Sequence, residues 1–418
     1  MKPALKLPVI LGSAAVLALS ALLLGKPAST PPSPMAVPPA PVVVPAAPVA
    51  VAPPPRVEVP PAKPGPVDAA APVIQIALLL DTSGSMDGLL DQARTQLWNI
   101  VNRFSRARRG GAAPRLELAL YAYGYAGEGA GSNEIRLLTP FTTDLDAISE
   151  RLFALRTSGG SENCGEVIQE ATQKLAWSTN PDAMRLIFIA GNETFTQGPV
   201  DFRKAVAVAS KRGITVNTIH CGDYEQGISD QWKAAATLAD GSYMNIDQNQ
   251  KVVELAAPQD AEIAKLGEEL NKTYVVYGGA AGKASQMRQQ EQDTLSRGVS
   301  VQNMAARSMA KSSGNYSNES WDLVDAVKKN KVDLGAVAAD DLPEPMRNLD
   351  GAGRKAWLEA REKERAALQQ RIQDLGKARQ QFLTDARKQN PTKEDATLDG
   401  VIGQVVSREA TKRQFTLE

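Results

Sequence analysis

Residues 73–86 read VIQIALLLDTSGSM, and this stretch decides the fold. An uninterrupted apolar run from residue 73 to 80, followed by turn residues, is typical of a strand buried on both faces in the middle of a parallel sheet. Asp81, Ser83 and Ser85 then stand at alternate positions on the loop that leaves the carboxyl end of this strand. Ligands of open α/β sheets bind at that edge, and small oxygen-bearing side chains suit a hard divalent cation. The plainer alternative is a polar turn that caps the next helix.

The segment from residue 73 to 246 alternates strand and helix patterns. This alternation predicts an α/β fold with a doubly wound, mostly parallel six-stranded sheet and helices on both faces. Besides 73–80, the strand patterns are 115–123, 135–138, 185–190, 214–220 and 243–246, and the helical patterns are 86–104, 144–155, 166–177, 200–212 and 229–239.

The D-x-S-x-S pattern of Asp81, Ser83 and Ser85 behind a buried strand resembles the metal-ion-dependent adhesion site of von Willebrand factor type A domains. The resemblance covers residues 73–250 and implies the fold of that family. It also implies a bound Mg²⁺ or Mn²⁺, with ligands that come from three loops at one edge of the sheet.

The resemblance assigns donors in the two further loops as well. In the second loop the family usually has a threonine after paired glycines, and Ser161 takes that place here, with Thr157 as an alternative donor. In the third loop Gly191 stands where the family usually has an aspartate, and Glu193, two residues on, can reach the ion. With fewer anionic ligands, the ion would be held weakly alone. It would be held more tightly when an Asp or Glu carboxylate of a protein partner completes its coordination.

The expected function is therefore protein binding through this adhesion-like site. The alternative is a structural or assembly scaffold with a vestigial metal site and a helical tail that makes the main contacts, and the glycine at residue 191 favours it. An enzyme is not expected, because the chain has one histidine, His220, and shows no Ser-His-Asp set, nucleotide loop or zinc spacing. Nucleic acid is not an expected partner either, because 47 basic and 47 acidic residues leave no net charge.

The N-terminal part of the chain predicts export. In residues 1–26, Lys2 and Lys6 precede a long apolar run, which indicates a signal peptide or an uncleaved membrane anchor. Residues 27–72 hold 17 of the 27 prolines and predict a linker, either a semi-rigid stalk or a disordered spacer. At roughly 3.1 Å per residue, an extended linker would reach on the order of 140 Å. We therefore expect a protein on the periplasmic side of a bacterial inner membrane, tethered by its first segment.

Residues 251–418 predict a helical C-terminal region. Its helical patterns are 261–274, 284–295, 299–311, 319–329 and a long charged pattern at 354–388. This last pattern has ten basic and five acidic residues, and Arg361, Arg365 and Arg379 interrupt its heptad seam. It is either a solvated helix packed on its own domain or a coiled-coil helix for a partner. The whole layout resembles that of exported bacterial von Willebrand type A proteins with a helical tail.

The two cysteines, Cys164 and Cys221, are expected to form a disulfide. Cys164 follows the glycine-rich second loop, and Cys221 follows the strand predicted to end at His220, so both fall at the carboxyl edge of the sheet. An exported protein folds in an oxidising compartment, where such bonds persist.

Overall fold

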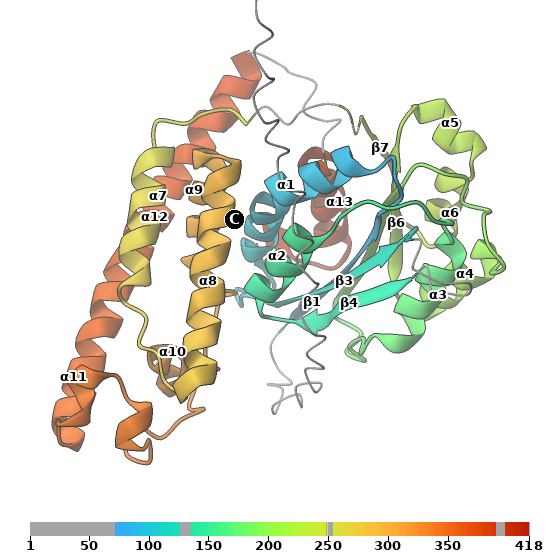
Figure 1. Ribbon diagram of the computed structural model, residues 1–418. Helices are drawn as coiled ribbons and strands as arrows, with labels where there is room; N and C mark the ends of the chain where they lie inside the picture. Colours follow the sequence, from blue (N-terminus) through green and yellow to red (C-terminus); the bar gives the residue numbers. More distant parts are fainter. Residues whose placement is uncertain (1–71, 126–134, 248, 250–253, 390–397, 418) are drawn as a thin grey trace, which may run out of the picture. The chain divides into compact units, whose positions relative to one another are not determined.

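The computed structural model describes residues 72–125, 135–247, 249, 254–389 and 398–417 (Figure 1). The membrane segment predicted at 1–26 and the linker predicted at 27–72, apart from its last residue, lie outside the described residues. Within the described part of the chain, no helix is both long enough and apolar enough to span a membrane.

A six-stranded sheet forms the centre of the fold, and β1 lies within it, in the order β4-β3-β1-β5-β6-β7 (Figure 1). The strands are β1 (Val73–Asp81), β3 (Arg115–Tyr123), β4 (Arg136–Thr142), β5 (Met184–Gly191), β6 (Thr215–Cys221) and β7 (Tyr243–Ile246). β1 pairs in parallel with β3 on one side and with β5 on the other, and only β4, at the edge, is antiparallel within this sheet. The predicted mostly parallel α/β sheet is confirmed.

β1 sends its side chains alternately into two hydrophobic cores. Its even-numbered residues, 74 to 80, face a core closed by α1 (Asp87–Ser105) and α2 (Leu145–Ala154). Residues 77 and 79 face the opposite core, closed by α3 (Cys164–Lys174), α4 (Phe202–Lys211) and α6 (Trp232–Leu238), while α5 (Tyr224–Ser229) precedes α6. Every residue of β1 is buried, so its sequence shows a continuous apolar run instead of alternation.

The C-terminal helix α13 (Leu398–Lys412), which the sequence did not predict, completes the first of these two cores. It lies along α1, where the backbone N–H of Leu398 donates to the side chain of Gln92 at 3.3 Å and Arg103 pairs with Asp399 at 2.7 Å. The short strand β8 (Thr416–Leu417) then pairs with β2 (Ala107–Arg108), directly after α1. Residues far beyond 250 in the chain therefore pack into the same core as β1 and α1.

The helical arm, defined here as residues 254–389, lies between β7 and α13 in the chain. It contains α7 (Asp260–Asn271), α8 (Gly279–Val299), α9 (Val301–Lys311), α10 (Leu323–Lys328), η1 (Ala339–Asp341), α11 (Glu344–Arg347) and α12 (Gly351–Gln389). The long helix predicted at 354–388 is α12, and it packs on α7 and α9 of its own chain.

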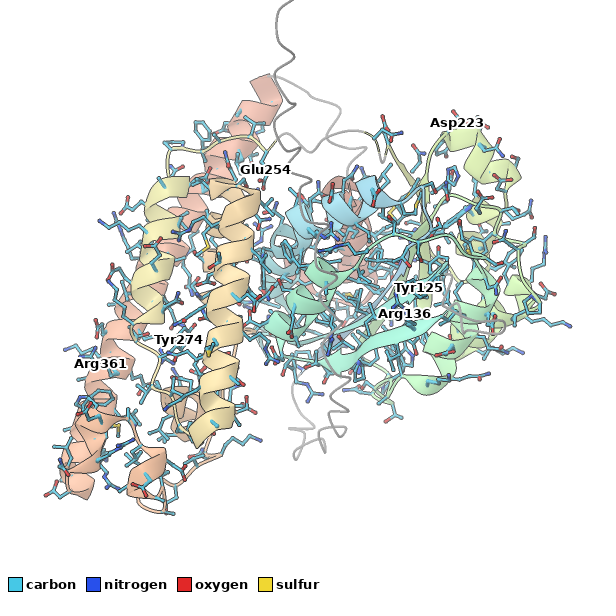
Figure 2. The ribbon with its side chains drawn as sticks, in the orientation of Figure 1. Tyr125, Arg136, Asp223, Glu254, Tyr274 and Arg361 are labelled. Carbon is cyan, nitrogen blue, oxygen red and sulfur yellow. The ribbon has the colours of Figure 1, made fainter. Side chains whose placement is uncertain are left out.

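Two of the arginines that interrupt the heptad seam of α12 are buried and paired. Arg365 bonds Asp322 at 2.6 Å, and its guanidinium lies 4.7 Å from the ring centre of Tyr274, which Figure 2 labels. Arg379 pairs with Asp260 in the same way. These two arginines therefore form ion pairs within the arm.

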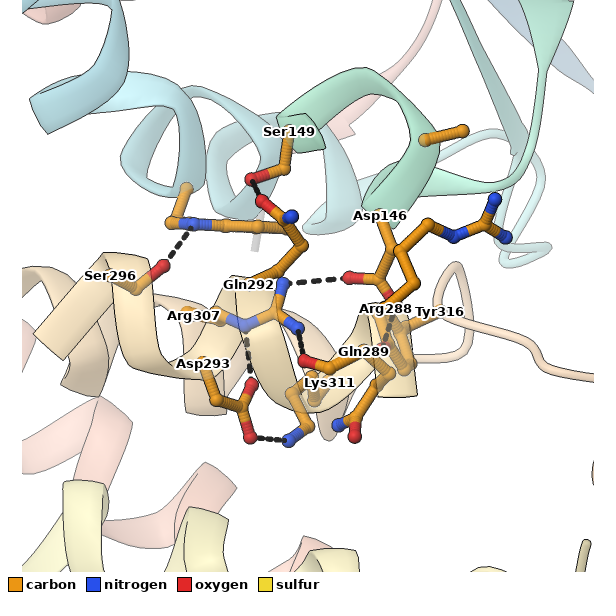
Figure 3. A network of polar contacts seen from close by, with 12 residues as sticks. Asp146, Ser149, Arg288, Gln289, Gln292, Asp293, Ser296, Arg307, Lys311 and Tyr316 are labelled. Atoms are coloured by element: carbon orange, nitrogen blue, oxygen red, sulfur yellow. Dashed lines mark hydrogen bonds and ion pairs between the residues drawn. The ribbon is translucent and has the colours of Figure 1, made fainter. Parts of the chain in front are cut away.

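A buried polar network joins the helical arm to the sheet domain (Figure 3). Arg307 of α9, with 0% of its surface exposed, bonds Asp146 of α2 at 2.8 Å and also bonds Asp293 of α8. Lys311 completes the cluster by bonding Asp293 at 2.8 Å, so two cations meet two anions. Burial by itself would raise the pKa of Asp293, but Lys311 and Arg307 together lower it to about 2.

Removal of Arg307 should therefore destabilise the protein strongly. Arg307→Ala leaves Asp146 and Asp293 short of a buried counter-charge, which typically costs about 3–5 kcal/mol in the free energy of unfolding. The matched control is Lys272→Ala, which breaks an exposed ion pair with Glu269 and should cost less than about 1 kcal/mol. Urea denaturation of both variants measures the difference, and equal losses would contradict the role given to the network.

Candidate functional site

The first loop leaves β1 at Asp81, which has 0% of its surface exposed. The backbone N–H of Ser83 donates a hydrogen bond of 2.7 Å to Asp81 Oδ1. The hydroxyl oxygens of Ser83 and Ser85 lie 3.4 Å apart, which fits alternate positions on one tight loop. Asp81 Oδ2 is buried and has no hydrogen-bond partner within the described residues. The structure thus brings the three predicted residues of this loop together and leaves one buried carboxylate oxygen without a hydrogen-bond partner.

The second loop turns Glu162, the neighbour of the predicted Ser161, toward Asp81. Glu162 is 5% exposed, whereas Ser161 is exposed. A Cβ atom placed on Gly124 would lie 2.6 Å from Asp81 Oδ1 and 3.2 Å from Glu162 Cγ, so the two acidic side chains meet over this glycine. Gly124 also has a φ of +73°, and both constraints require a residue without a side chain.

The buried pair of acidic side chains, Asp81 and Glu162, disfavours the ionised form of Asp81. Burial, and then the neighbouring Glu162, raise the pKa of Asp81 to about 9. Glu162 is the charged neighbour that shifts this pKa most. Two carboxyl groups in contact disfavour double ionisation unless a cation compensates them.

The donor set fits a hard divalent cation. It combines the carboxylate oxygens of Asp81 and Glu162 with the hydroxyls of Ser83 and Ser85, and Mg²⁺ and Mn²⁺ prefer such oxygen ligands. The part of the chain that the structure describes contains no group of three His, Cys, Asp or Glu residues placed to hold a metal ion. A cation at this edge would therefore depend on the serine hydroxyls as well as on the two carboxylates.

The third loop contributes an amide from Asn192. A Cβ atom placed on Gly191 would lie 2.5 Å from the hydroxyl oxygen of Tyr123 and 2.9 Å from Asp81 Oδ2, so a side chain at residue 191 has no space. Instead, Asn192 Nδ2 donates to Ser85 Oγ at 3.0 Å. The family pattern places its aspartate at residue 191, whereas in this structure the side chain of residue 192 reaches the first loop. The sequence does mark Asn192, because it is the first polar residue after a buried strand.

Three other predicted donors are not drawn into the first loop. Ser161 is exposed, and Thr157 donates its hydroxyl to Asp87 Oδ1 at 2.7 Å. The side chain of Glu193 is exposed, and none of its described contacts reaches a residue of the first loop.

The predicted disulfide between Cys164 and Cys221 is wrong, because both cysteines are free and buried. Cys164 begins α3 and belongs to the core on the α3 side of the sheet. Cys221 ends β6 with its side chain in the core on the α1 side. Both residues do fall at the carboxyl edge, as predicted, but the sheet itself lies between their side chains.

Both thiols should therefore resist modification in the native protein. Burial raises the pKa of each thiol well above its ordinary value, and the thiolate is the reactive form. A maleimide should label neither cysteine in native buffer and both after unfolding without reductant, as read by peptide mass spectrometry. A cross-linked peptide pair containing residues 164 and 221 would contradict the structure.

The fold and the site together define a doubly wound α/β domain with an oxygen-rich candidate cation site at the carboxyl edge of its sheet. The sequence of residues 75–256 matches the von Willebrand factor type A domain family, and this part of the chain is a von Willebrand type A domain. Comparison with curated protein sequences finds no match.

Solved structures similar to this chain share little sequence with it. Proximal thread matrix protein 1 from the mussel byssus, solved with a zinc-occupied MIDAS motif, is 12% identical over 42% of each chain, with a TM-score of 0.32. BatB from Bacteroides thetaiotaomicron is 16% identical over 42% of this chain and 90% of that chain, with a TM-score of 0.32. The pilus adhesin SpaC from Lactobacillus rhamnosus GG is 13% identical over 43% of this chain and 28% of that chain, with a TM-score of 0.31. The chain thus spans about two fifths of the length of the byssus protein.

Proposed function

We propose that the von Willebrand type A domain is a protein-binding module that holds Mg²⁺ or Mn²⁺ at the first loop. Asp81 and Glu162 would hold the cation through carboxylate oxygens, and Ser83 and Ser85 through their hydroxyls. When bound, the cation supplies a positive centre for a carboxylate from an Asp or Glu of the partner. The observation that carries this proposal is the buried Asp81 Oδ2, which has no partner within the described residues and lies beside a second acidic side chain.

The residues around Asp81 hold the site in one arrangement. The N–H of Ser83 fixes Oδ1, whereas Oδ2 has no hydrogen-bond partner within the described residues. The Tyr123 hydroxyl donates to the backbone oxygen of Ala190 at 2.8 Å and covers Gly191 beside Oδ2. This packing excludes water from the base of the site, and a charged ligand is stabilised more strongly where water is excluded.

A vestigial metal site in an assembly scaffold is the competing proposal. The third loop favours this proposal. It supplies the Asn192 amide, which donates a hydrogen bond to Ser85, and it does not supply a carboxylate that would be a further metal ligand. In that case the helical arm, fixed to the sheet domain by the Arg307 network, would make the main partner contacts. The two proposals differ in whether binding needs a divalent cation.

Asp81→Asn decides between them. The substitution keeps the shape of the side chain but removes the charge, so the variant should take up no Mn²⁺ where the wild-type protein binds it at roughly millimolar concentration or below. Asp230→Asn is the matched control, because Asp230 is a half-buried acid at the end of α5 whose carboxylate accepts a hydrogen bond from Gln226, and this variant should bind Mn²⁺ as the wild type does. Titration calorimetry measures all three proteins. Equal heats for wild type and Asp81→Asn would establish the scaffold proposal.

We also propose that the domain works outside the cytoplasm, tethered to a membrane by residues 1–26 and spaced from it by residues 27–72. The charge and apolar pattern of the first segment supports export, and the proline content of the second supports an extended spacer. Protease added to intact spheroplasts should cleave within residues 27–72. Protection of this segment until the membrane is lysed would overturn the proposed location.

A further inference from the structure

Two aromatic side chains from other elements hold the third loop of the site by its backbone. His220, near the end of β6, places Nε2 at 3.3 Å from the backbone oxygen of Asn192. Trp232, at the start of α6, donates its indole N–H to the backbone oxygen of Glu193 at 2.8 Å. Because a carbonyl oxygen only accepts, the His220 ring bonds it through a protonated Nε2. The backbone oxygens of two consecutive loop residues are therefore held by side chains of β6 and α6.

The two rings are themselves held rigidly. His220 is 2% exposed and Trp232 is 0% exposed, and their ring centres lie 5.7 Å apart. A Cβ atom on Gly227 would lie 2.6 Å from the His220 ring, so this glycine makes room for the imidazole. Phe195, further along the third loop, packs edge-on against Trp232 at 4.8 Å. The rings therefore have little freedom to shift, and the loop that they bond has little freedom as well.

This arrangement determines where the Asn192 side chain points. With its backbone oxygen bonded to His220, Asn192 directs Nδ2 to Ser85 Oγ at 3.0 Å, and Ser85 in turn lies 3.4 Å from Ser83 Oγ. A continuous set of contacts thus runs from His220 to the hydroxyls of the first loop. The third loop lacks a carboxylate ligand, but it orients the hydroxyl ligands through an amide.

We propose that His220 and Trp232 are positioning residues of the cation site, which they serve by holding Asn192 on Ser85. The proposal rests on the proposed cation binding and adds a role for the only histidine of the chain. Residues that orient metal ligands without touching the ion typically change metal affinity by about 10- to 100-fold when they are substituted. The same order of loss is expected here, since a free third loop would leave Ser85 without its fixed donor.

The test uses substitutions that remove the bond and others that keep it. Trp232→Phe and His220→Leu each remove a donor to the loop, and each should weaken Mn²⁺ binding by about tenfold. His220→Gln places an amide N–H where the imidazole N–H was, and it should restore most of the lost affinity. Trp98→Phe is the matched control, because Trp98 is an equally buried indole that bonds Ser296 at 3.1 Å on the other face of the sheet.

Two measurements on the full chain separate the possible results. Titration calorimetry gives the Mn²⁺ affinity, and amide hydrogen exchange of residues 192–195 reports the order of the third loop. Weaker binding with faster exchange in Trp232→Phe and His220→Leu, and neither change in Trp98→Phe, supports the proposal. Wild-type affinity in both loop variants, or an equal loss in Trp98→Phe, overturns it while cation binding stands. If the wild-type protein takes up no Mn²⁺, the proposed function fails first and the positioning role fails with it.

Discussion

The burial of a carboxylate at the end of the central strand is the constraint on which the site depends. Helices cover both faces of β1, so the side chain of Asp81 at the end of this strand is fully buried. A buried acid needs either a proton or a compensating cation, and the described surroundings provide a second acid, Glu162, and no basic partner. Gly124 and Gly191 bring backbone close enough to seal the base of the site. The proposed cation binding rests on this imbalance more directly than on the serine pattern.

The sequence predicted the sheet well because its strands are either continuous apolar runs or clean alternations. It also placed Asp81, Ser83 and Ser85 together, since alternate residues on a tight loop must converge. In each of the other two loops, the side chain that the structure turns toward the first loop is one residue away from a predicted donor, because spacing in a loop does not tell which side chain turns inward. Glu162 and Asn192 are therefore findings of the structure.

Other errors have a different physical origin. The disulfide was predicted from the edge on which both cysteines lie, but the face to which a strand residue points depends on register, and Cys221 points away from Cys164. The helix α13 was not predicted, although its buried apolar residues 398, 401, 402, 405, 406 and 410 recur at helical spacing. The sequence does not reveal that this apolar stripe packs on α1. The arginines of α12 seemed to weaken a helical seam, yet their partners lie on α7 and beside α10, far away in the sequence.

The insertion of the helical arm between β7 and α13 has a consequence for how the protein folds. The contact between Leu398 and Gln92 joins residues 306 positions apart, so the face of α1 that receives α13 stays uncovered until residues 398–412 pack on it. Contacts between such distant residues form slowly, and exposed apolar surface on a nascent chain invites aggregation. Until residues 398–412 pack on α1, the sheet domain therefore exposes an apolar surface that a chaperone can cover.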